Sequence, residues 1–195
     1  MVRYRTKVEG APILKEQRHI SLIGPGCVGK SVTGAALAEC LARPLIDLDR
    51  VFCECVFAIG PYIKRHGYEA YVIENAKLAE YMLVQAAEPV VFVCSSGFLA
   101  SDTADSLRRK NQTLLRANAR TVLLLPCSDL SEATHIIQKR QSERPYGQHP
   151  SRAAEVYQKR VPEYLAFGAD LTLYANGRLP ETLARQIVSS LNAYA

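Results

Sequence analysis

Short hydrophobic runs alternate along the chain with longer stretches of amphipathic sequence. Apolar runs bounded by glycine, proline or acidic residues are typical of strands buried in a parallel sheet. The stretches between them repeat their apolar positions about every 3.6 residues, as helices do. Strands are predicted at residues 19–23, 45–49, 89–94, 121–125 and 170–174. Helices are predicted at 32–41, across 50–87 with breaks at Gly60-Pro61 and Gly67, and at 102–117, 129–141, 151–166 and 180–193.

This alternation predicts an α/β fold, with a five-stranded parallel sheet and helices on both faces, because parallel strands need crossover connections. A length of 195 residues favours one domain. We expect residues 1–17 to form a flexible extension and residues 18–195 a single domain. No apolar run reaches the length of a membrane span, about 18 residues, and no hydrophobic segment of a secretory signal follows the basic N-terminus. We therefore expect a cytoplasmic protein with no membrane partner.

The charge composition favours an anionic ligand. Lys and Arg outnumber Asp and Glu by 24 to 19, which gives a net charge of +5. The basic residues are scattered and form no dense block, so nucleic acid is not an expected partner. The six cysteines show no zinc-finger spacing, and we interpret them as reduced, mostly buried thiols.

Residues 24–31, Gly-Pro-Gly-Cys-Val-Gly-Lys-Ser, match the pattern G-x-x-x-x-G-K-[ST] between a predicted strand and a predicted helix. In such a phosphate-binding loop (P-loop), glycines let backbone N–H groups surround phosphate oxygens, the lysine reaches the β- and γ-phosphates, and the serine hydroxyl binds Mg²⁺. The motif predicts a P-loop NTPase architecture with ATP and Mg²⁺ as cofactors. The expected nucleotide-binding residues are Gly24, Gly26, Cys27, Val28, Gly29, Lys30, Ser31 and Val32.

Two aspartates, Asp47 and Asp49, close the second predicted strand. Carboxyl ends of parallel strands face the ligand crevice, and residues two apart in a strand project to the same side. Both carboxylates are therefore expected to face the γ-phosphate, one near Mg²⁺ and one as acceptor of a hydroxyl proton. The alternative is a polar strand end that caps the following helix.

Over residues 18–193 the chain resembles the shikimate kinases, small P-loop kinases of nucleoside-monophosphate-kinase-like architecture that phosphorylate the 3-hydroxyl of shikimate. The resemblance rests on four features in order: the P-loop, Asp47-Leu48-Asp49, Arg144-Pro145, and Arg160-Val161-Pro162-Glu163-Tyr164 followed by Ala169-Asp170. It implies that Asp47 assists Mg²⁺ and that Asp49 contacts the acceptor hydroxyl as candidate base. It also implies that Arg144, in a lid at about 140–152, reaches the nucleotide phosphates, and that Arg160 pairs with the acceptor's carboxylate. Lys30, Asp49 and Arg144 are then the expected catalytic residues, and helices at about 50–87 bind the acceptor.

The sequence departs from the family pattern on the acceptor side. Where the family has a second carboxylate-binding arginine and its glutamate partner, this chain has Val72 and Asn75, and Arg65 is the nearby substitute that we consider. The family's Gly-Gly-Gly turn is Ser95-Ser96-Gly97 here, and we place these three residues in the acceptor pocket. The alternative role of the serines is to cap the next helix.

The function expected from these features is transfer of the γ-phosphoryl of Mg-ATP to a hydroxyl of shikimate or of a related small hydroxylated acid. The alternatives are a kinase with a different acceptor, a nucleotide-binding protein with a non-catalytic regulatory role, and, less favoured, a P-loop enzyme acting on nucleic acid. A monomer or weak dimer is expected. We interpret Tyr68, Tyr71 and Tyr81, which recur at helical spacing, as core residues.

Overall fold

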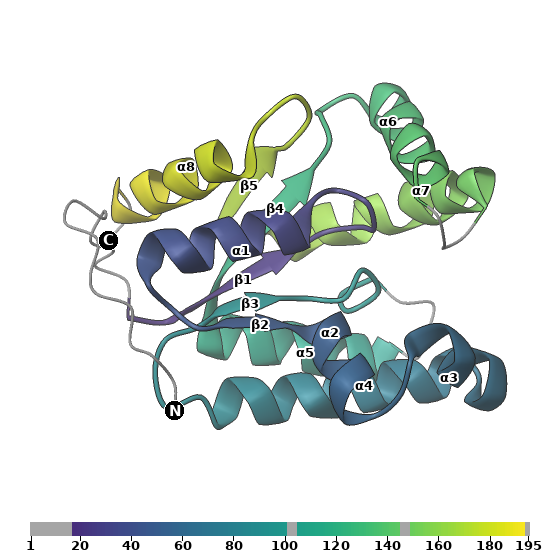
Figure 1. The fold of residues 1–195 in the computed structure, drawn as a ribbon, viewed down its shortest axis with the longest axis horizontal. Helices are drawn as coiled ribbons and strands as arrows, with labels where there is room; N and C mark the ends of the chain where they lie inside the picture. The colour runs from purple at the N-terminus through teal and green to yellow at the C-terminus, as the bar shows by residue number, and fades with distance from the viewer. Residues whose placement is uncertain (1–16, 101–104, 145–148, 194–195) are drawn as a thin grey trace.

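The computed structural model describes residues 17–100, 105–144 and 149–193. In these residues five parallel strands form one sheet in the order β2-β3-β1-β4-β5 (Figure 1). The strands are β1 (His19–Ile23), β2 (Leu45–Asp47), β3 (Val91–Val93), β4 (Ala119–Leu125) and β5 (Leu171–Tyr174). The predicted α/β fold with a five-stranded parallel sheet is confirmed.

The central strand β1 lies between β3 and β4, two strands that follow each other in the sequence. Its residues pair with β3 on one side and with β4 on the other, and β2 lies outside β3. In open sheets of this kind, ligands bind at the carboxyl ends of the strands, where the strand order reverses. The loops that follow β1, β2 and β3 therefore meet at one edge of the sheet.

Helices cover both faces of the sheet. In Figure 1, α1 and α8 lie over one face and α4 and α5 over the other, while α6 with the start of α7 and α2 with α3 stand on opposite sides of the carboxyl edge. The helices are α1 (Lys30–Leu41), α2 (Leu48–Cys55), α3 (Ile59–His66), α4 (Tyr68–Val84), α5 (Asp105–Asn118), α6 (Leu130–Ser142), α7 (Pro150–Phe167) and α8 (Pro180–Ala193).

A continuous apolar core lies between the sheet and its helices. Val91, Phe92 and Val122 are fully buried, as expected for strands covered on both faces. Gly34 brings α1 close to this core, because a β-carbon there would collide with Val93. A smaller cluster at the acceptor side contains Phe52, whose ring meets two tyrosine rings edge to face. These clusters hold the loops of the carboxyl edge in place.

Two predicted boundaries are wrong. The second strand ends at Asp47 and α2 starts at Leu48, because the Asp47 side chain caps the helix and the chain turns there. Gly60-Pro61 does not interrupt the helical region; both residues lie in the first turn of α3, where the N–H that proline lacks would have no partner within the helix. The break comes earlier, at residues 56–58, and the predicted break at Gly67 is confirmed.

Parts of other predictions lie outside the described residues: nearly all of the extension at 1–17, the start of the helix at 102–117, the middle of the lid at 140–152, and residues 194–195. In the described part of the chain, no helix combines the length and the hydropathy that a bilayer crossing needs.

Candidate active site

The P-loop joins β1 to the first turn of α1. Gly24 has φ +141°, and a β-carbon there would come within 2.5 Å of the Leu124 carbonyl oxygen, so only glycine fits this turn. Gly29 has φ +97° and precedes the first residue of α1. The N–H groups of this loop and of the helix start are those that can surround a phosphate. The predicted loop residues therefore lie together, with Ser31 and Val32 exposed beside them.

Lys30 is buried in this loop and folds back onto it. Its Nζ donates hydrogen bonds of 2.8 Å to the carbonyl oxygens of Gly24 and Pro25. Burial lowers the pKa of Lys30 to about 8, although the negative charge of Asp49 acts in the opposite direction. The lysine is therefore held inside the loop by neutral acceptors, which an anionic phosphate would replace.

The end of α6 is fastened to the P-loop through Cys27, which has φ +63°. The Cys27 Sγ donates to Oε1 of the buried Gln141 at 3.1 Å, and Nη1 of Arg140 donates to the Cys27 carbonyl oxygen at 3.0 Å. Arg144, the predicted lid arginine, is exposed, and in the described part of the chain its side chain makes no hydrogen bond to the loop. Sequence analysis favoured Arg144 and missed the contact of Arg140, because the partner of Arg140 is a backbone atom distant in sequence.

The prediction that the two aspartates share one face of a strand is wrong. The Asp47 Oδ1 accepts from the backbone N–H groups of Asp49 at 3.2 Å and Arg50 at 3.4 Å, so Asp47 is the N-cap of α2. Asp49 lies in the first turn of that helix. The capping role considered as an alternative is therefore observed for Asp47, and it leaves the second oxygen, Oδ2, without a hydrogen bond from the described residues.

Asp49 is held by two hydroxyl groups. Strand β2 pairs with β3, so the first turn of α2, which carries Asp49, follows β2 beside the turn that follows β3. The Ser95 Oγ donates to Asp49 Oδ1 at 2.5 Å, and the Tyr71 hydroxyl donates to the same oxygen at 3.1 Å. Burial, and then the Asp49 charge, raise the pKa of Tyr71 far above its usual value, so this phenol stays a donor.

Arg160 lies on the other side of the Ser95-Ser96-Gly97 turn, buried in α7. Its Nη2 donates to the Tyr68 hydroxyl at 2.7 Å and its Nη1 to Ser96 Oγ at 3.3 Å. A β-carbon at Gly97 would collide with the Tyr68 hydroxyl and lie 3.3 Å from Arg160 Nη2, so the turn fits closely against this pair. Among the described residues no carboxylate lies within ion-pair distance of Arg160, and a buried guanidinium of this kind suits an anionic ligand.

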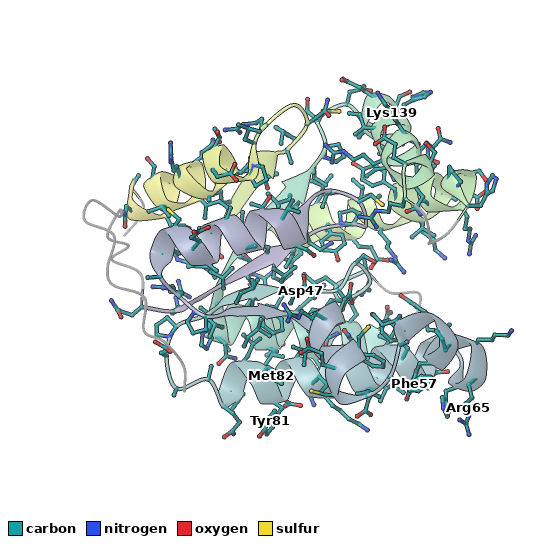
Figure 2. The ribbon with its side chains drawn as sticks, viewed as in Figure 1. Asp47, Phe57, Arg65, Tyr81, Met82 and Lys139 are labelled. Carbon is teal, nitrogen blue, oxygen red and sulfur yellow. The ribbon has the colours of Figure 1, made fainter. Side chains whose placement is uncertain are left out.

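The positions that depart from the family pattern are apolar or directed elsewhere. Val72 is buried with Phe52 and Tyr71 in the smaller cluster. Asn75 is also buried, and its Nδ2 has no hydrogen-bond partner among the residues that the structure describes. Arg65 lies in the last turn of α3, exposed, and Figure 2 shows it at the far end of that helix, pointing away from Asp47. Arg65 therefore does not replace the arginine missing at position 72.

Sequence analysis assigned Tyr68, Tyr71 and Tyr81 to the core. Tyr71 is buried in the smaller cluster as predicted, and Tyr68 packs against that cluster. Tyr81 is instead 62% exposed, and the hydroxyls of Tyr68 and Tyr71 also bond to Arg160 and Asp49. Helical spacing alone placed the two site tyrosines on one face of α4 but gave no sign of what their hydroxyls contact. The alternative role of the serines, capping of the next helix, does not account for their side chains, which bond to Asp49 and Arg160.

The residues at the loop fit Mg²⁺. Hard divalent cations prefer oxygen ligands, and Mg²⁺ keeps several waters while binding one or two protein oxygens. The Ser31 hydroxyl is exposed at the start of α1, and Asp47 offers the oxygen that does not cap α2. In the described residues there is no group of three or more His, Cys, Asp or Glu side chains that would form an all-protein metal cage. A cation at this place would therefore take water and phosphate oxygens as ligands in addition to the oxygens of Ser31 and Asp47.

Known proteins resemble this chain in sequence over most of its length. A sequence model of the family "Shikimate kinase" matches residues 26–192. Over 145 residues the chain is 29% identical to the pentafunctional AROM polypeptide of Malassezia globosa; the match covers 74% of this chain and only 8% of that much longer polypeptide.

Solved structures share the fold. The shikimate kinase of Acinetobacter baumannii, in complex with shikimate, superposes with a TM-score of 0.74 at 20% identity, covering 92% of this chain and 96% of that one. A gluconokinase of Sinorhizobium meliloti gives 0.64 at 18% identity, covering 92% and 94%. The family match extends over most of the chain, and the described P-loop, Asp49 and Arg160 occupy one edge of the shared fold. The chain belongs to the shikimate kinase family.

Proposed function

We propose that the protein transfers the γ-phosphoryl group of Mg-ATP to a hydroxyl of shikimate or of a related small hydroxylated acid. The observation that carries this proposal is the place of Asp49. Its charge acts on Lys30, the lysine of the phosphate-binding loop. Its donor Ser95 is the neighbour in sequence of Ser96, which bonds to Arg160. A candidate base thus lies between a phosphate-binding half and an anion-binding half.

In the proposed reaction the acceptor hydroxyl attacks the γ-phosphorus in line. The new O–P bond forms as the bond to the β–γ bridging oxygen breaks, and that oxygen leaves with the electron pair on ADP. The hydroxyl proton passes to Asp49 Oδ2, because Oδ1 is already held by Ser95 and Tyr71. Lys30 exchanges its loop carbonyls for the β- and γ-phosphate oxygens and stabilises their charge.

Mg²⁺, held by Ser31 and Asp47, would supply further positive charge to the phosphates. We include the lid at about 140–152 in the proposal: its closure would bring Arg144 to the nucleotide and exclude water from the transfer. Arg160 would hold the acceptor's carboxylate and so fix which hydroxyl faces Asp49.

The test is ADP release from Mg-ATP by the purified protein, with and without shikimate, beside a panel of hydroxy acids and polyols that includes D-gluconate. We expect an acceptor-dependent rate, abolished in Lys30→Met and reduced at least about 100-fold in Asp49→Asn, as is typical of losing a general base. The exposed Lys139→Met variant serves as the matched control. An ADP release rate that no compound stimulates would contradict the proposal.

A kinase with another acceptor is the second candidate. Val72 is packed in an apolar cluster, and Ser95 and Ser96 add hydroxyls where the family pattern has glycines. These features, with the fold shared with a gluconokinase, favour an acceptor that is bound by more hydrogen bonds and fewer charges. Stimulation by D-gluconate or a related acid but not by shikimate would select this candidate. Tight ATP binding without stimulation by any compound would select the regulatory role instead.

A further inference from the structure

Two serine–tyrosine pairs stand side by side at the proposed acceptor site. Ser95 and Ser96 are consecutive in sequence, and Tyr68 and Tyr71 are one helical turn apart on α4, with ring centroids 5.8 Å apart. The hydroxyls of Ser95 and Tyr71 both donate to Asp49 Oδ1. Those of Ser96 and Tyr68 both accept from the Arg160 guanidinium. One hydroxyl pair thus bonds to the carboxylate of Asp49, and the other bonds to the guanidinium of Arg160.

The two pairs give Asp49 and Arg160 separate hydrogen-bond partners. A carboxylate and a guanidinium that bond to each other form a strong bidentate pair. Here each charge instead has two neutral partners from the same two elements, the turn after β3 and helix α4. Asp49 keeps Oδ2 without a hydrogen bond from the described residues, and Arg160 has no carboxylate partner among them. Each charge can therefore act on a different part of one ligand.

We propose that Tyr71 and Ser95 are positioning residues that orient Asp49 toward the reacting hydroxyl, whereas Tyr68 and Ser96 determine specificity by shaping how Arg160 receives the acceptor's carboxylate. This proposal rests on the proposed function, since it assigns roles within the same pocket. The acceptor that fits is a polyhydroxylated monocarboxylic acid: its single carboxylate meets one guanidinium, and its hydroxyls meet the serine and tyrosine hydroxyls.

The test compares two variants that each remove one hydroxyl and keep the ring, Tyr71→Phe and Tyr68→Phe. Steady-state kinetics with the acceptor that best stimulates ADP release gives kcat and KM, and calorimetry with Mg-ADP present gives the Kd of shikimate and of D-gluconate. We expect Tyr71→Phe to lower kcat about 3- to 10-fold with an unchanged acceptor Kd, the effect of one hydrogen bond. Tyr68→Phe should raise acceptor KM and Kd by a similar factor with kcat nearly unchanged.

The serine variants provide an independent check. Ser95→Ala should behave like Tyr71→Phe. In the double variant the loss of kcat should differ from the product of the two single losses, because both hydroxyls bond to one oxygen of Asp49 and their effects are coupled. Ser96→Ala should behave like Tyr68→Phe. Thermal unfolding of each variant shows whether a loss comes from folding, and a split between kcat and KM is not expected from a general loss of structure.

Neutral analogues of the acids isolate the contribution of the carboxylate to binding. The methyl ester of shikimate and D-glucitol lack the carboxylates of shikimate and D-gluconate. We expect Tyr68→Phe to change the ratio of acid to neutral affinity, and Tyr71→Phe to leave that ratio as in the unaltered protein. Equal effects of both variants on kcat and KM, or no effect of either, would overturn the proposal.

Failure of the proposed function is distinguishable from failure of this inference. If no compound stimulates ADP release, calorimetry still shows whether the acids bind and whether only the Arg160 pair affects their affinity. Binding that is sensitive to Tyr68→Phe and insensitive to Tyr71→Phe would then support the anion-binding half without transfer. If neither shikimate nor D-gluconate binds to the unaltered protein, the anion-binding half is overturned.

Discussion

The protonation of Lys30 links nucleotide binding to pH. Burial in the P-loop holds its pKa near 8, below its ordinary 10.5. The phosphate needs the charged ammonium, so binding of Mg-ADP must take up a proton wherever the free lysine is neutral. We expect uptake of close to one proton at pH 9 and almost none at pH 6.5, and a fall in affinity of up to about tenfold per pH unit above pH 8.

Calorimetry in two buffers of different ionisation enthalpy measures this uptake, and Lys139→Met should leave it unchanged. The contribution of Lys30 to folding stability changes with pH in the opposite direction to the nucleotide affinity. Because the pKa in the folded protein lies below that of the unfolded chain, this contribution increases as the pH rises from about 8 to 10.5. Affinity that stays constant up to pH 9 would show that Lys30 is fully charged before the nucleotide binds, and would contradict the lowered pKa.

Asp47 caps α2 through its carboxylate. We propose that its charge also assists Mg²⁺, and substitutions can separate these two roles. Asp47→Asn keeps a good helix cap but removes the charge, so we expect unchanged thermal stability and a several-fold higher Mg²⁺ requirement for ADP release. Asp47→Ala should show the same requirement and lose about 1 kcal/mol of stability as well. Equal melting temperatures for the two variants would contradict the capping role.

At the residue scale, sequence could identify groups whose chemistry is local. The P-loop motif is contiguous, so Lys30 and its glycines could be assigned from spacing alone. For Asp49 the expected geometry, a strand face shared with Asp47, is wrong, because the Asp47 cap that turns the chain depends on side-chain hydrogen bonds. The partners of Arg160 come from α4 and from the turn after β3, and no local pattern brings these segments together.

At the element scale, α6 is fastened to the P-loop at the point where the proposed lid begins. Arg140 and Gln141 both bond to Cys27. We expect Arg140→Met to weaken Mg-ADP binding about 3- to 10-fold, the effect of one or two hydrogen bonds that hold the loop, with a small change in melting temperature. The neighbouring Lys139, which Figure 2 shows on the outer side of α6, gives the matched control Lys139→Met. Equal losses in both variants would contradict the fastening role.

Element types could be predicted from periodicity, because the inner strands β1, β3 and β4 are buried, mostly apolar runs and the longer helices bury residues on one face. Boundaries were less predictable where one side chain decides them, as Asp47 does for α2. The same holds for α3, where Pro61 fits within the first turn. Periodicity also could not show that α4 presents two hydroxyls to the pocket, since its apolar face continues through Tyr71 and Val72 into the cluster around Phe52.

At the scale of the whole molecule, the strand order assembles the site. Because β3 lies between β2 and β1, the turn after β3 stands between Asp49 on one side and the P-loop on the other. The nearest group to a β-carbon on Gly26 would be the Ser96 side chain, at 3.8 Å, so phosphate-binding loop and acceptor turn are neighbours. Strand alternation predicts a parallel sheet but not this order, and therefore not which loops meet.

The carboxyl edge of the sheet is proposed to transfer a phosphoryl group from Mg-ATP to a small hydroxylated acid. The most direct measurement is ³¹P NMR of the protein with Mg-ATP and each acid of the panel, which observes the phosphorylated product itself. We predict a new phosphomonoester signal that grows as ADP forms with shikimate or a related acid, and that is absent with Asp49→Asn over the same time. Inorganic phosphate as the only product beside ADP, with every acid, would contradict the account.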